Sequence, residues 1–184
     1  MSPEEIVTAT RHWLEKAVIG LNLCPFAKPV YAREQIRYVV SEAETPEALL
    51  ADLIAELQAL AAAEPEEVET TLLIHPRVLS DFLDYNDFLG VAEEAVADLG
   101  LEGVLQVASF HPDYQFADTE PDDITNYTNR SPYPTLHLLR EASVERAVAT
   151  VQDASEIYER NMETLRRLGL EGWRRLGVEG RGDW

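Results

Sequence analysis

Two matched apolar runs in the chain end in the pair His-Pro: Leu72-Leu73-Ile74-His75-Pro76 and Ala108-Ser109-Phe110-His111-Pro112. Each run is short, apolar and bounded by polar sequence, which predicts a buried β-strand. The proline favours an extended conformation for the histidine before it and ends the strand. The sequence therefore predicts a histidine at the carboxyl end of each of two buried strands.

The elements around these runs predict an α/β fold. Strands are expected at Ile36–Val40, Thr70–Ile74, 104–110 and 135–139, and helical periodicity predicts helices over 2–21, 45–64, 80–99, 142–151 and 154–168. Asn86 and Gly90 could divide the third helix into two pieces. Alternation of strands and helices predicts one domain over residues 1–176, with a mostly parallel sheet of about four strands flanked by about five helices. Residues 177–184 form a short polar segment that is expected to fray.

Composition limits the partners and the compartment. The 184 residues include 34 Asp and Glu against 15 Lys and Arg, a net charge of −19. Such a surface repels phosphate backbones and anionic lipid, so we expect no nucleic acid or membrane partner. Cys24 is the only cysteine, so no intrachain disulfide can form. No signal peptide or apolar span is evident, and we expect a cytoplasmic protein.

The two His-Pro pairs favour a site at one edge of the sheet. Ligands of open α/β sheets bind beyond the carboxyl ends of the strands, so His75 and His111 are expected to face the same crevice if their strands are parallel neighbours. His137, within the strand at 135–139, could point toward it, and Cys24 could supply a thiolate. The resulting candidates for catalysis are Cys24, His75, His111 and His137, with Cys24 or an imidazole as nucleophile or base.

Each candidate also has a purely structural interpretation. A His-Pro pair can end a strand with its imidazole bonded to a backbone carbonyl. His137 can be a satisfied buried histidine, and Cys24 an inert buried thiol. The sequence leaves both interpretations open.

The loop at 111–134 is long for a compact domain, which favours a functional role or disorder. Its second half combines an arginine with nearby amide and hydroxyl groups, and Arg140 follows the last strand. Such donors suit a carboxylate or phosphate, which predicts a small anionic ligand. The candidate substrate-binding residues are Asn126, Asn129, Arg130, Ser131 and Arg140. Alternatively, Arg130 pairs with acidic residues of its own loop.

Three segments together resemble a known family: Asn22-Leu23-Cys24-Pro25-Phe26-Ala27, Ala108-Ser109-Phe110-His111-Pro112, and Asn129-Arg130-Ser131-Pro132-Tyr133-Pro134 with the following Leu136-His137-Leu138-Leu139-Arg140. The chain resembles an uncharacterised bacterial family, a domain of unknown function of about this length. The resemblance covers nearly the whole chain and implies one complete domain. It implies no activity and no catalytic residues.

Three functions remain as hypotheses. The first is a small-molecule enzyme that uses the Cys and His residues. The second is a metal or cofactor protein with the same side chains, although their long spacings predict no metal site and no cofactor is identified. The third is a non-catalytic binding or assembly module, in which the histidines would be distant from one another or hydrogen-bonded individually. No G-x-G-x-x-G or Walker pattern is present, and the oligomeric state is not predicted.

Overall fold

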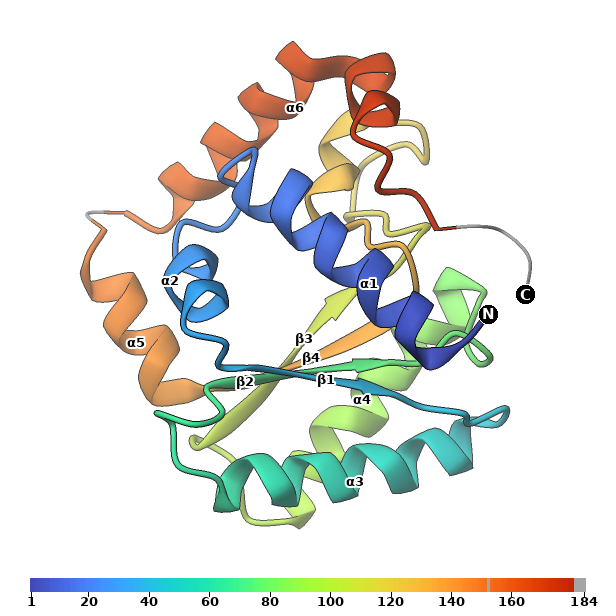
Figure 1. Cartoon of the computed structure of the whole chain (residues 1–184), viewed down its shortest axis with the longest axis vertical. Coiled ribbons are helices and arrows are strands. Elements are labelled where there is room, and N and C mark those ends of the chain that lie inside the picture. The colour runs from blue at the N-terminus through green and yellow to red at the C-terminus, as the bar shows by residue number, and fades with distance from the viewer. Residues whose placement is uncertain (152, 181–184) are drawn as a thin grey trace.

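The computed structural model describes residues 1–151 and 153–180. In this part of the chain four strands form one sheet in the order β1-β2-β4-β3 (Figure 1). The strands are β1 (Ile36–Val40), β2 (Thr70–Ile74), β3 (Leu105–Phe110) and β4 (Thr135–Arg140). The α/β class and the four strands are confirmed, and the bounds of β1 and β2 match those predicted.

The prediction of a mostly parallel sheet is wrong. Only β1 and β2 pair in parallel, whereas β4 is antiparallel to both β2 and β3. The reason is the loop after β3, which contains the short 3₁₀ helix η2 (Ile124–Asn129) but no helix that crosses the sheet. The chain therefore re-enters the sheet at the edge where β3 ends, and β4 runs back between β2 and β3.

Two helices cover one face of the sheet, α3 (Pro46–Ala62) and α4 (Phe82–Asp98), as Figure 1 shows below the strands. Helix α3 begins at the Thr45 cap, whose hydroxyl accepts from the Ala48 N–H. Leucines at helical spacing bury their side chains under the sheet: Leu49, Leu53, Leu57 and Leu60. Each contributes about 2 kcal/mol through burial. Helix α4 is continuous, so the predicted break within it does not occur.

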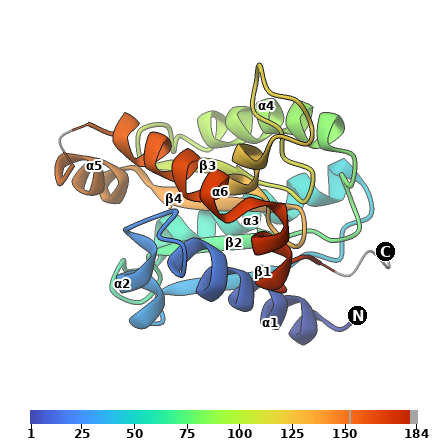
Figure 2. The same cartoon turned by 90° about the horizontal axis from the view of Figure 1, so that it is seen from above.

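The opposite face packs against α1 (Pro3–Trp13) and α6 (Ser155–Arg175). Ser2 and Glu5 form a capping box at the start of α1, as expected from a serine followed three residues later by glutamate. The π-helix η1 (Leu14–Ile19) continues α1, and the short helix α2 (Ala27–Ala32) follows. Helix α5 (Glu141–Ala149) lies at the end of the sheet away from the N-terminus (Figures 1 and 2).

The C-terminal part of the chain returns to the second core. Gly169 has a positive φ of 69° inside α6, which marks a break between two helical pieces. Trp173 and Val178 are buried against α1 and its neighbours. The predicted frayed segment is thus described over 177–180, and its remainder, 181–184, lies outside the described residues. None of the described helices is long and apolar enough to cross a bilayer.

Candidate functional site

His75 and His111 lie at the same end of the sheet, where β2 and β3 both finish, because these two strands point in the same direction. Ile74 and Phe110 face the α1 side of the sheet, so the next residue of each strand turns its side chain toward α4. Both rings contact the ring of Tyr85 from α4, with centroid distances of 5.8 Å for His75 and 4.9 Å for His111. Neither histidine has any exposed surface.

Backbone groups satisfy most of the hydrogen-bonding capacity of these two rings. The Nδ1 of His75 lies 3.0 Å from the Val78 carbonyl, and the Nε2 of His111 lies 3.0 Å from the Leu79 carbonyl. The Asp113 N–H donates to Nδ1 of His111 at 3.0 Å, so both nitrogens of that ring are used. The Nε2 of His75 is buried and has no partner among the described residues.

Burial keeps these imidazoles neutral. Desolvation lowers the pKa of His75 to about 4, against an ordinary value of 6.5. It also lowers the pKa of His111, although the carbonyl of Leu79 opposes the shift. Since a carbonyl only accepts, the proton of His75 is on Nδ1 and that of His111 is on Nε2. The two rings therefore act in this structure as neutral donors that hold the loop after β2.

Tyr85 joins the ends of β3 and β4. Its hydroxyl donates to the Thr135 carbonyl at 2.7 Å and accepts the Phe110 N–H at 3.0 Å. Burial raises its pKa far above the ordinary value of a phenol. The hydroxyl therefore stays protonated at neutral pH and serves as a bridge between two strands.

His137 faces the other side of the sheet, where its ring lies 5.8 Å from that of Phe110. Its Nε2 is 2.8 Å from the Thr70 hydroxyl, and that hydroxyl donates to the Leu138 carbonyl at 2.5 Å. The single hydroxyl proton is thus occupied, so Nε2 of His137 donates to Thr70. Desolvation lowers the pKa of His137 to about 4. The sheet therefore separates His137 from His75 and His111.

Cys24 lies in the exposed loop after η1. Although the residue is exposed, the protein around it removes water from the thiol and raises its pKa, against the N–H groups of Phe26 and Ala27. No hydrogen bond joins its sulfur to a histidine in the described part of the chain. A raised pKa lowers the fraction of nucleophilic thiolate at neutral pH.

Asn126 holds the long loop together from inside. Its Oδ1 accepts from the Phe116 N–H and from the Thr119 hydroxyl, each at 2.9 Å, and its Nδ2 donates to the Glu120 carbonyl at 2.9 Å. The side chain is fully buried. All of these contacts are within the loop.

The two predicted arginines donate to backbone carbonyls. Arg130 donates to Tyr114 at 3.1 Å and to Pro121 at 2.7 Å, and its guanidinium stacks 4.3 Å from the ring of Tyr127. One Nη of Arg140 lies 2.7 to 3.1 Å from three carbonyls at and beyond the end of α3, those of Leu60, Ala63 and Val68, and its two N–H groups are shared among them. Arg140 therefore caps α3.

The remaining predicted residues have similar roles. Asn129 donates to the Ser109 carbonyl at 3.0 Å, and the Ser131 hydroxyl donates to the Tyr133 carbonyl at 2.6 Å. Among the described residues, no three His, Cys, Asp or Glu side chains come together as a metal site. The catalytic and substrate-binding roles of all these side chains stay predictions.

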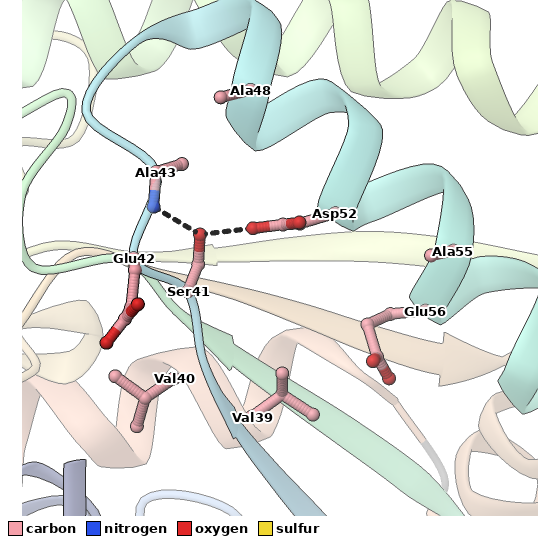
Figure 3. A pocket seen from close by; sticks show the side chains of 9 residues that line it. All are labelled: Val39, Val40, Ser41, Glu42, Ala43, Ala48, Asp52, Ala55 and Glu56. Carbon is pink, nitrogen blue, oxygen red and sulfur yellow. Dashed lines mark hydrogen bonds between the residues drawn. The ribbon is translucent and has the colours of Figure 1, made fainter.

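A groove that the sequence did not predict lies between β1 and α3 (Figure 3). We call it the β1–α3 groove; it is open to solvent and has a volume of about 520 Å³. Its lining residues come from the end of β1, the following loop and the near flank of α3: Val39, Val40, Ser41, Glu42, Ala43, Ala48, Asp52, Ala55 and Glu56. Space remains here because Ala48 and Ala55 are small, whereas the leucines of α3 point under the sheet.

Three acidic residues and no basic residue line the β1–α3 groove. Asp52 accepts from the Ser41 hydroxyl at 2.6 Å, and that oxygen accepts the Ala43 N–H at 3.1 Å, which fixes the start of the loop (Figure 3). Glu56 binds Arg37 through two contacts of 3.0 and 3.2 Å. Glu42 is exposed. After the Arg37 pair is counted, the groove retains a net negative charge.

The sequence contains a partial signal for this groove. Ala48, Asp52, Ala55 and Glu56 recur at helical spacing beside the buried leucine stripe, so small and acidic residues share one flank of α3. That the flank faces β1 depends on how the helix packs, which periodicity alone does not determine.

Comparison with known proteins identifies a family without an assigned activity. A family model described as a protein of unknown function, DUF1415, matches residues 5–175. This confirms the expectation of an uncharacterised family. No curated protein and no solved structure matches the chain.

Proposed function

The chain belongs to the DUF1415 family of unknown function, and from its geometry we propose that it is a binding module whose ligand site is the β1–α3 groove. The ligand is a positively charged group of another molecule. The observation that carries the proposal is a groove of about 520 Å³ with three acidic residues and no basic residue in its lining.

The state of the histidines supports a binding function over a catalytic one. His111 uses both nitrogens on backbone groups, and His75 and His137 each have a hydrogen bond of their own. A general base needs a free lone pair within reach of a substrate proton. Both nitrogens of His111 are engaged, the free Nε2 lone pair of His75 is buried away from the surface, and Cys24 has a raised pKa. The enzyme hypothesis stays a prediction without geometric support.

The charge of the groove supports a cationic ligand. Carboxylates within about 4 Å of a cation attract it, and the attraction is greater where protein replaces water on one side. The net charge of −19 adds a long-range field of the same sign. The small anionic ligand expected from the sequence relied on Arg130 and Arg140, whose guanidinium groups here bind carbonyls.

A labelled cationic peptide tests the proposal. The probe is a fluorescein-labelled hexapeptide amide of alternating Lys and Val, titrated with the protein and followed by fluorescence anisotropy. The double variant Glu42→Gln, Asp52→Asn removes two groove charges and retains an oxygen that can accept from Ser41. Each charge at or near the surface contributes about 0.3 to 1 kcal/mol, so we expect Kd to rise about threefold to thirtyfold.

A matched control separates the groove from general attraction to an acidic protein. The double variant Glu145→Gln, Glu159→Gln removes the same charge from exposed positions on α5 and α6. We expect this control to change Kd by less than twofold. Equal weakening in both double variants, or no binding to the parent protein, contradicts the proposal.

A further inference from the structure

We infer that the occupant of the β1–α3 groove is an extended basic segment of another polypeptide, which pairs with β1 as an additional strand. The inference rests on the function proposed above and specifies its ligand. It starts from the backbone of β1, the outermost strand on this side of the sheet.

Two hydrogen bonds fix which groups of β1 face outward. The Thr70 N–H donates to the Gln35 carbonyl at 3.4 Å, and the Ser41 N–H donates to the Ile74 carbonyl at 2.7 Å. Because the backbone groups of a strand alternate in direction, the odd-numbered residues from 35 to 41 face β2. The N–H and C=O groups of Ile36, Tyr38 and Val40 consequently point away from the sheet.

The opposite edge of the sheet, formed by β3, is partly covered by the loop that follows that strand. On β3 the Ser109 carbonyl accepts from Nδ2 of Asn129 at 3.0 Å, and the N–H of the next residue but one, His111, donates to the Asn129 carbonyl at 3.1 Å. The loop after β3 thus occupies the carboxyl end of that edge. The carboxyl end of β1 instead adjoins the groove, which includes Val39, Val40 and Ser41.

The side chains beside β1 set the expected sequence of the partner. Residues of an added strand alternate between the two faces of the sheet. On the α3 face, at the carboxyl end of β1, they lie beside Asp52, which favours Lys or Arg there, whereas Glu56 is already paired with Arg37 of β1. On the opposite face they lie beside Ile36 and Tyr38, which are partly buried apolar neighbours and favour β-branched residues.

Charge argues against a second copy of the chain as the occupant. Pairing of two β1 edges would bring two grooves with the same acidic lining side by side, in a protein of net charge −19. Like charges opposite one another destabilise a strand pair. A basic segment of a different protein removes this repulsion, because its cations lie between the carboxylates.

Two N-methylated isomers of the Lys-Val hexapeptide test strand addition. One isomer is methylated on the Val amides and the other on the Lys amides, so that each blocks the amides on one side of the strand. We expect one isomer to bind at least tenfold more weakly than the unmethylated peptide and the other to stay within threefold. The isomer that loses affinity shows whether the added strand runs antiparallel or parallel to β1.

The outcomes distinguish this inference from the proposed function. If both isomers bind like the parent peptide, or both weaken equally, strand addition is overturned although the groove still binds cations. If the unmethylated peptide itself shows no groove-dependent binding, the proposed function fails first. A dimer in solution with slow hydrogen exchange at Tyr38 and Val40 would identify a second copy as the occupant, and would also overturn the inference.

Discussion

Acidification should destabilise this protein through its buried histidines. The pKa of His75 is about 4 in the folded chain and 6.5 when the ring is in water. Below 6.5 the unfolded chain therefore binds a proton that the folded chain does not. Stability from this group is complete above pH 6.5 and is lost progressively as the pH falls toward 4.

The size of the loss follows from the two pKa values. Between pH 7 and pH 5 the linkage removes about 2 kcal/mol from the free energy of unfolding for His75. His137 has a similar pKa and adds to the loss. Protonation of carboxylates in a chain of net charge −19 would reduce repulsion, so it does not cause the decrease.

Urea unfolding followed by far-UV circular dichroism at both pH values measures the effect. In His75→Asn the amide can still donate to the Val78 carbonyl, and we expect the decrease between pH 7 and pH 5 to shrink by about 2 kcal/mol. The control Val78→Ala removes buried surface at the same place without removing a titrating group, so it should keep the full decrease. An unchanged decrease in His75→Asn would refute the assignment of a buried neutral imidazole.

Three further predictions concern the side chains of Arg140, Tyr85 and Cys24. Replacement of Arg140 by Met leaves three carbonyls at the end of α3 without their shared donor and should lower the free energy of unfolding by about 2 to 4 kcal/mol; a loss below 1 kcal/mol in urea titration would contradict the capping role. Tyr85→Phe leaves the Thr135 carbonyl and the Phe110 N–H without their partner, so native-state hydrogen exchange at Phe110 should accelerate about tenfold or more, against no change at strand amides that do not contact the ring. Alkylation of Cys24 by iodoacetamide should rise with a midpoint above the ordinary thiol pKa of 9.0, and a midpoint near neutral pH would instead favour a reactive thiolate.

The sequence was sufficient for the strands and most of the helices because their patterns are local. Thr70–Ile74 is a continuous apolar and β-branched run, and the structure has a strand with these bounds. Helix α2 (Ala27–Ala32) was missed because it is short and has Pro29 in its first turn. The direction of β4 depends on the path of the loop at 111–134, and no local pattern records that path.

In the candidate site too, local patterns could be predicted from the sequence and long-range packing could not. Proline after each of His75 and His111 marked the end of its strand, but the sequence did not predict that β4 lies between the two strands or that both rings contact Tyr85. The alternation of β4 places His137 on one face, yet only the register with β2 puts that ring opposite Leu72, away from the other two. The β1–α3 groove was not predicted because its lining comes from a strand, a loop and a helix, and these form a groove only when they pack together.

The most direct measurement of the central claim is a ¹H–¹⁵N chemical-shift titration of the full chain with the unmethylated Lys-Val hexapeptide. If the β1–α3 groove is the ligand site, the largest shifts fall on Tyr38, Val40, Glu42 and Asp52, while the amides of His111 and Asn126 stay in place. Shifts concentrated around His137 and Cys24, with none along β1, would contradict the claim and return the site to the side chains on the α1 face of the sheet.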